Sequence, residues 1–275
     1  MNPLERALVE KAGHENGFEN VLFGAHDREV LLGSARHRAE ASITLDESKW
    51  LLELKSAITK RLAPELARGF PDATLHNGKF FVASIPELGK LLRRAARLAQ
   101  ALPTQAADNF ESQVREELAK LPVDATTGTE VERMVRQRVG QNAFRNAMLD
   151  YWGGACALTG IRVPEVLRAS HAKAWADCDN DAERLDVFNG FLLCANLDAL
   201  FDRFLITFDD SGKIMISTRL SRDQHAALGL NPASRLRWIA NEHLIYLHYH
   251  RSCSWKGNDK VRPGKQPKSK EQQYL

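Results

Sequence analysis

Residues 188–202 read FNGFLLCANLDALFD, and this stretch decides the fold of the surrounding part of the chain. Residues 191–194 form a short apolar run that is typical of a buried strand. The apolar residues that follow fall at helical spacing: Leu197, Leu200 and Phe201. Upstream, residues 169–171 read ASH. The order predicts a strand or loop that ends in a histidine, then a strand, then a helix.

Three polar residues of this pattern suit phosphodiester hydrolysis. His171 can accept a proton from water near neutral pH, because an unperturbed imidazole has a pKa of about 6.5. Asn189 can hold the histidine loop through its amide. Asp198 can bind Mg²⁺, which takes one or two carboxylates together with waters and substrate oxygens. Asp202 follows Asp198 by four residues on the same helical face, so it is a second candidate ligand.

A series of short motifs resembles the HNH endonucleases, in the branch whose first motif reads Ser-His. The motifs occur in order as Arg138-Val139-Gly140-Gln141 with Phe144-Arg145, Cys156-Ala157-Leu158-Thr159-Gly160, Ala169-Ser170-His171 with Trp175, Arg184-Leu185-Asp186, Asn189-Gly190 with Leu192-Leu193, and Asp198 with Phe201-Asp202. The resemblance covers about residues 130–220. It implies a ββα-metal fold in which His171 is the general base, Asn189 orients it and Asp198 binds Mg²⁺ or Mn²⁺.

Two positions depart from the commonest HNH pattern. Ser170 stands where many members place a metal-binding Asp, so Ser170 joins the candidate ligands. Asp198 stands where many members place His or Asn. The Cys pairs that bind structural zinc in some HNH proteins are missing, and we expect no structural zinc. Cysteines occur only at 156, 178, 194 and 253, without C-x-x-C spacing, which predicts buried free thiols.

Length and composition predict a cytoplasmic α+β protein of 275 residues. No apolar run approaches a membrane helix, and no signal-peptide pattern opens the chain. We expect a DNA-recognition domain with a helical connector over 1–125, an HNH nuclease domain over 126–250 and a basic tail over 251–275. The tail carries seven Lys and Arg against two Asp and Glu, whereas the whole chain has a net charge of only +3.

Local patterns predict the remaining elements. Strands are expected at 20–23, 29–32, 41–45, 79–83 and 244–249, and a hairpin at 204–208 with 213–217. Helices are expected at 50–62, at 88–98 and between Pro103 and Pro122. Residues 125–128 form the best linker, after which a capping box of Thr129 and Glu132 opens a helix through Met148.

The first hundred residues resemble, more faintly, the sulfur-binding domains of phosphorothioate-dependent restriction endonucleases. The residues that carry this resemblance are Glu15-Asn16-Gly17-Phe18, Leu32-Gly33-Ser34 and the basic cluster of residues 35–38. Sulfur in place of a phosphate oxygen is larger, softer and less hydrated, so ring and aliphatic edges favour it while Arg and His hold the charge. The expected contacts are Arg36, His37, Phe70 and Pro71.

These observations predict a modification-dependent endonuclease that binds double-stranded phosphorothioate DNA and acts as a homodimer. Three arginines are candidate phosphate contacts, although each also suits a surface charge or an ion pair: Arg138, Arg145 and Arg184. One alternative keeps the nuclease but changes the reader to one for methylated DNA, a plain sequence or a signalling molecule. Another, prompted by Ser170, is a DNA-binding protein with a degenerate nuclease fold.

Overall fold

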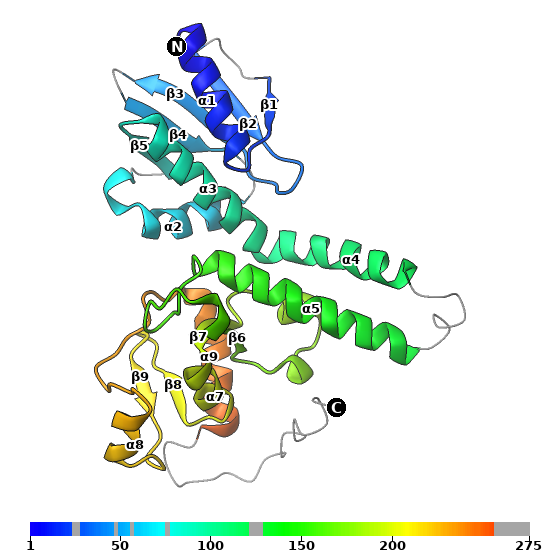
Figure 1. Ribbon diagram of the computed structural model, residues 1–275, viewed down its shortest axis with the longest axis vertical. Helices are drawn as coiled ribbons and strands as arrows, with labels where there is room; N and C mark the ends of the chain where they lie inside the picture. The colour runs from blue at the N-terminus through cyan, green and yellow to red at the C-terminus, as the bar shows by residue number, and fades with distance from the viewer. Residues whose placement is uncertain (24–27, 47–48, 56–57, 75–77, 121–128, 256–275) are drawn as a thin grey trace. The chain divides into compact units, whose positions relative to one another are not determined.

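The computed structural model describes residues 1–23, 28–46, 49–55, 58–74, 78–120 and 129–255, and it mixes helices with sheets as an α+β protein (Figure 1). The chain divides into two compact units. The first unit comprises Met1–Gly154 together with Asp179–Val187. The second unit comprises Ala155–Cys178 together with the chain from Phe188 onward.

The first unit is built on a five-stranded antiparallel sheet in the order β1-β2-β3-β4-β5. The strands are β1 Asn20–Leu22, β2 Glu29–Gly33, β3 Ala41–Asp46, β4 Lys49–Leu54 and β5 Lys79–Val82. Alternate apolar residues of the central strands are fully buried, among them Val30, Ile43 and Leu52. The period of two places these side chains on one face, which forms the core of the unit.

Helices cover this sheet and extend beyond it. They are α1 Pro3–Glu15, α2 Thr59–Gly69, α3 Ile85–Ala101, α4 Pro103–Ala119, α5 Thr129–Tyr151 and the short α6 Asp181–Arg184, with a 3-10 turn at Pro71–Ala73. Helices α1 and α3 lie side by side across the sheet (Figure 1). Helices α4 and α5 run next to each other and are joined by an ion pair between Arg138 and Glu117.

The Asn16-Gly17-Phe18 motif is a structural turn that fastens α1 to α3. The Asn16 side chain donates to the Ala12 carbonyl over 2.7 Å and accepts from Arg93 Nε over 2.9 Å. Gly17 has a φ of +92°, and a Cβ there would stand 2.8 Å from the Cβ of Ala96. The turn therefore requires glycine both for its backbone conformation and for its close approach to α3.

Up to residue 255, where the described part of the chain ends, the second unit holds two small sheets and three helices. Its elements are β6 Leu167–His171, β7 Gly190–Cys194, α7 Ala195–Asp202, β8 Ile206–Phe208, β9 Ile214–Ile216, α8 Arg222–Ala227 and α9 Asn241–Ser254, with 3-10 turns at Pro164–Val166 and Trp175–Asp177. Its core is aromatic. The Phe201 ring stacks on His250 of α9 at 4.0 Å and meets Phe191 of β7 edge-on at 5.7 Å. These rings fix α9 against α7 and β7.

Two predicted elements are wrong. Residues 50–62 were predicted as a helix, but β4 and the start of α2 divide them. Trp50, Leu52 and Leu54 alternate with less buried residues because β4 lies between β3 and β5. Residues 244–249 were predicted as a strand, but they belong to α9. The buried residues of that segment recur at helical spacing from His243 through Leu247 to His250.

The other predicted elements are confirmed with shifts of a few residues at their ends, including the first three strands, α3, α4 and the β8–β9 hairpin. Three of the cysteines are buried free thiols, as predicted: Cys156, Cys178 and Cys194. The linker at 125–128, the side chain of Thr129 and residues 256–275 of the tail lie outside the described residues. Within the described chain, the helices are all too short or too polar to span a bilayer.

Candidate functional site

Strands β6 and β7 and helix α7 form a continuous ββα unit. The two strands pair antiparallel from Leu167 opposite Cys194 to His171 opposite Gly190. Helix α7 begins at Ala195, directly after β7, and packs against β6 (Figure 1). The last residue of β6 and the residues just before β7 therefore meet at one end of this hairpin.

His171 is the last residue of β6 and is half-buried. Its ring meets the ring of Trp175 edge-on, with a centroid distance of 6.0 Å and an angle of 87° between the planes. Trp175 opens the 3-10 turn that follows the strand. The imidazole is thus supported by a neighbouring ring and still reaches the surface, as a base that meets a substrate requires.

Asn189 is completely buried, and its side chain forms hydrogen bonds with the segment that follows His171. Its Oδ1 accepts from the Lys173 backbone N–H over 2.8 Å, and its Nδ2 donates to the Lys173 carbonyl over 3.2 Å. Its own carbonyl accepts from the Ala172 N–H over 3.0 Å. These three bonds fix the backbone that carries His171, which is the geometry expected for an orienting residue.

Ser170, next to the last residue of β6, lies beside Asp198 of α7. The Ser170 hydroxyl donates to Asp198 Oδ1 over 2.5 Å, from a serine that is 1% exposed. Asp202, the last residue of α7, is close enough to His250 for its charge to raise the pKa of that imidazole. The two carboxylates thus have different neighbours: Asp198 is joined to β6, whereas Asp202 acts on α9.

The oxygen atoms of Ser170 and Asp198 fit a hard divalent cation in their chemistry. Within the described part of the chain, no three His, Cys, Asp or Glu side chains gather into a metal-binding group. Mg²⁺ commonly keeps several waters and takes one or two carboxylates, so a single aspartate beside a hydroxyl suits it better than it suits Zn²⁺.

Lys173 is a residue of this region that the sequence analysis did not single out. Its main chain is held by Asn189, and its Nζ lies 5.4 Å from the centre of the Tyr249 ring on α9. A cation over an aromatic face is held electrostatically. Its position two residues after His171 was the available signal, because it puts a positive charge on the same short segment as the predicted base.

In the first unit, the basic cluster of residues 35–38 has one buried member. The His37 ring is 4% exposed and packs edge-on against Phe18 at 4.8 Å. Its Nε2 bonds the Gly17 carbonyl over 2.9 Å, and its Nδ1 accepts from the Ala39 N–H over 3.3 Å. Burial lowers the pKa of His37. The ring anchors the loop, while Arg36 is exposed beside it.

Phe70 and Pro71 lie at the C-terminal end of α2, whereas Arg38 of the basic cluster lies beside its N-terminal end. Phe70 caps the C-terminus of α2 and is half-buried, and Pro71 is exposed at the start of the next turn. Arg38 lines a hollow together with Ile58, at the N-terminus of the same helix. An 11-residue helix is about 16 Å long, so the two ends of α2 are separated by that length.

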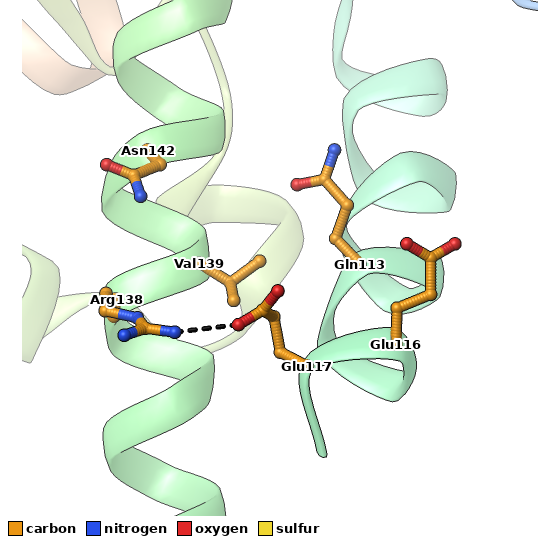
Figure 2. Close-up of a pocket in the computed structure, with 6 residues that line it drawn as sticks. All are labelled: Gln113, Glu116, Glu117, Arg138, Val139 and Asn142. Atoms are coloured by element: carbon orange, nitrogen blue, oxygen red, sulfur yellow. Dashed lines mark hydrogen bonds and ion pairs between the residues drawn. The ribbon is translucent and has the colours of Figure 1, made fainter. Parts of the chain in front are cut away.

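The three predicted phosphate arginines also belong to the first unit. Arg138 pairs with Glu117 over 2.8 Å across a hollow of about 380 Å³ between α5 and α4, whose lining also includes Glu116 (Figure 2). Arg184 pairs with Asp181 over 2.8 Å. Arg145 is half-buried on α5. Arg138 and Arg184 therefore already have a carboxylate partner, and the hollow beside Arg138 carries more acidic than basic side chains.

Comparison with known families finds a match over the ββα region. Residues 156–209 match the family model described as HNH endonuclease. The matched segment contains β6, β7, α7 and β8, and with them His171, Asn189 and Asp198. A search of curated proteins found no match to the chain. The family match supports a nuclease, a hydrolase that acts on nucleic acid.

Proposed function

We propose that this protein is a metal-dependent DNA endonuclease with His171 as its general base. The observation that carries the proposal is the arrangement at the end of β6, where His171 stands on a backbone fixed by Asn189 inside the segment that matches the HNH family. A preorganised base contributes to hydrolysis because no reorganisation is needed when the proton moves.

In the proposed mechanism, a neutral His171 accepts a proton from the water that attacks the scissile phosphate. Asn189 holds the imidazole in place through the main chain of Lys173. Asp198, with Ser170 beside it, holds a divalent cation such as Mg²⁺ or Mn²⁺. That cation supplies charge neutralisation at the phosphate and at the leaving oxygen. Lys173 adds a positive charge to the segment that follows His171, with its ammonium over the ring of Tyr249.

We further propose that the first unit reads phosphorothioate-modified double-stranded DNA. The support is its basic loop, in which the buried His37 fixes the backbone and Arg36 is exposed to solvent. Phe70 and Pro71 offer a ring and an aliphatic edge at the surface of the same unit. Guanidinium groups suit phosphate charge, and apolar edges suit the weakly hydrated sulfur.

A cleavage assay tests both proposals on otherwise identical phosphorothioate, methylated and unmodified duplexes with Mg²⁺ or Mn²⁺. We expect cutting of the phosphorothioate duplex, its loss in His171→Ala with retained binding, and its loss after chelation. Asp198→Asn is expected to raise the metal concentration needed for half-maximal cutting. His14→Ala, at an exposed histidine of α1, is the matched control and should cut normally.

Each other outcome selects a different function. Equal cutting of all three duplexes keeps the nuclease and removes the sulfur reader, and preference for the methylated duplex replaces the reader. Binding without any cutting that depends on His171 favours a DNA-binding protein with a degenerate nuclease fold, as Ser170 in place of the usual acid suggests. Loss of both cutting and binding in His171→Ala assigns the histidine a structural role.

A further inference from the structure

The main chain of Lys173 is fixed by two buried side chains. Its N–H donates to Asn189 Oδ1 over 2.8 Å, and its carbonyl accepts from Asn189 Nδ2 over 3.2 Å. The thiol of Cys178 donates to the same carbonyl over 3.6 Å and accepts from Asn189 Nδ2 over 3.4 Å. The bonds to residue 173 involve its main chain, so they set the position from which its side chain extends.

Burial alternates along the segment that contains the proposed base. Ser170 and Ala172 are 1% and 4% exposed, whereas His171 and Lys173 are half-buried and reach the surface. Because they are two positions apart, the Cα atoms of His171 and Lys173 are separated by at most about 7 Å. Lysine carries its charge on a flexible four-carbon stem. A phosphate group bound beside His171 therefore lies within reach of the ammonium group of Lys173.

Helix α9 supplies the surface on which the Lys173 side chain lies. Its Nζ is 5.4 Å from the centre of the Tyr249 ring, within the roughly 6 Å over which a ring face attracts a cation. The ring attracts the ammonium without contributing a net negative charge of its own. The neighbouring His250 stacks on Phe201 of α7 at 4.0 Å, which fixes this part of α9 against the ββα unit.

Hydrolysis of a phosphodiester requires positive charge at the group that reacts. Negative charge develops on the phosphate oxygens and on the leaving oxygen as water attacks, and a positioned cation stabilises it. A lysine suits this task because its ammonium is a compact point charge that binds phosphate. The fixed main chain and the Tyr249 ring hold the charge in place before the reaction, so little reorganisation is needed.

We propose that Lys173 is a catalytic residue that contacts a non-bridging oxygen of the scissile phosphate, and that Tyr249 positions its ammonium. The inference rests on the proposed function, because it assumes that the chain hydrolyses a phosphodiester with His171 as the base. It deepens that function by giving the positive charge a target. It also extends the site to α9, which lies outside the matched residues 156–209.

The test separates chemistry from binding. The single-turnover cleavage rate is measured at saturating enzyme with Mn²⁺, on a phosphorothioate duplex and on an unmodified duplex of the same sequence. The dissociation constant is measured by fluorescence anisotropy without divalent metal. The variants are Lys173→Met, which removes the charge but leaves the main-chain bonds, and Lys173→Arg, which keeps the charge. Lys213→Met is the matched control, because Lys213 is an exposed lysine just before β9 in the same unit.

We expect Lys173→Met to lower the single-turnover rate about 100-fold, the usual effect of removing one group that stabilises developing charge. Binding should weaken no more than about tenfold, as for the loss of one phosphate contact. Lys173→Arg should stay within about tenfold of the wild-type rate, and Lys213→Met should match the wild type. Weakened binding with an unchanged rate makes Lys173 an ordinary backbone contact and overturns the proposal. So does a rate in Lys173→Arg as low as that in Lys173→Met.

A double-mutant cycle tests Tyr249 separately. Tyr249→Leu removes the ring and is expected to lower the rate about fivefold, whereas Tyr249→Phe keeps the ring face and should change it less. In the Lys173→Met background, Tyr249→Leu should have almost no further effect, because the cation that the ring holds is gone. An equal loss in both backgrounds assigns Tyr249 a structural role and overturns its part of the proposal. Far-UV circular dichroism checks that each variant folds.

The outcomes also separate this inference from the proposed function. Cutting that depends on His171 but is unchanged in Lys173→Met removes the role of Lys173 and leaves the nuclease. The absence of any cutting of either duplex that depends on His171 overturns the proposed function, and this inference with it.

Discussion

Both polar atoms of the Asn189 side chain form hydrogen bonds with the main chain of Lys173, two residues beyond the proposed base. We predict that Asn189→Ala lowers the cleavage rate roughly 100-fold, because a displacement of about 1 Å at a reacting group has an effect of that size. It also leaves buried main-chain groups without partners, so the free energy of unfolding falls by about 1–3 kcal/mol. Cleavage kinetics and urea unfolding measure the two effects separately.

Asn189→Asp is the sharper variant, since its carboxylate still accepts from the Lys173 N–H but cannot donate to the Lys173 carbonyl. We expect weakened cleavage with DNA binding within a few-fold of the wild type. A variant that keeps full cleavage while losing stability contradicts the positioning role and leaves Asn189 as a packing residue.

A residue's role could be proposed from sequence where the motifs that suggest it lie close together in the chain. It could not be proposed correctly where distant residues bury the side chain. The motif spacing was enough to propose His171 and Asn189, because a hairpin brings residues at its end together from a short sequence distance. His37 was predicted to contact DNA from its basic neighbours. Its burial depends on Phe18 and Gly17, about twenty positions away, and no local pattern contains that contact.

At the scale of elements, two segments satisfied more than one periodicity. Leu51, Leu54 and Ile58 fit a helix, but Trp50, Leu52 and Leu54 also fit a strand, and the partners β3 and β5 decide in favour of the strand. Residues 244–249 are apolar and aromatic, which favours a strand locally. The stacking of His250 on Phe201 selects a helix instead, and that partner lies 49 residues away.

Helix α9 makes the second unit sensitive to acid through His250. Burial lowers the pKa of His250 to about 4, while the Phe201 carbonyl and the charge of Asp202 raise it and Arg251 lowers it further. Its Nδ1 bonds Thr207 Oγ1 over 3.0 Å and its Nε2 bonds the Phe201 carbonyl over 3.1 Å. The folded state therefore holds the neutral ring, whereas the unfolded chain takes up a proton below about pH 6.5.

The sign of the pH dependence follows from that difference. The stabilisation is complete above about pH 6.5 and is lost as the pH falls toward 4, by roughly 3 kcal/mol in total. We predict that urea unfolding followed by tryptophan fluorescence shows this loss between pH 7 and 4.5. His250→Gln should be less stable at pH 7 and flatter with pH than the wild type. Equal slopes in the two proteins contradict the assignment.

At the scale of the whole molecule, the sequence pointed to a domain boundary at 125/126, whereas the contacts join α5 to the first unit. The Arg94 side chain donates to the carbonyls of Asp150 and Tyr151 at the end of α5. The Tyr151 hydroxyl donates to Glu65 over 2.8 Å. These bonds link positions more than fifty residues apart, so composition and linker signals near residue 125 could not contain them.

The number of matched segments in each chain bears on how both strands of a duplex are cut. Each chain carries one segment that matches the HNH family, and therefore one proposed base, so one molecule is expected to cut one strand at a time. We propose that two copies of the chain, most simply a symmetric homodimer, cut the two strands of a duplex together. On a supercoiled plasmid that carries the recognised modification, we predict that nicked circles form first and linear DNA follows.

The dependence of the products on enzyme concentration tests this prediction. If two copies act together, the ratio of linear to nicked product rises with enzyme concentration, and an excess of the inactive His171→Ala chain traps the plasmid in its nicked form by occupying one half of the pair. Sedimentation on the modified duplex should then show two chains for each site. Linear DNA produced without a nicked intermediate at limiting enzyme, and unaffected by added His171→Ala, contradicts the homodimer.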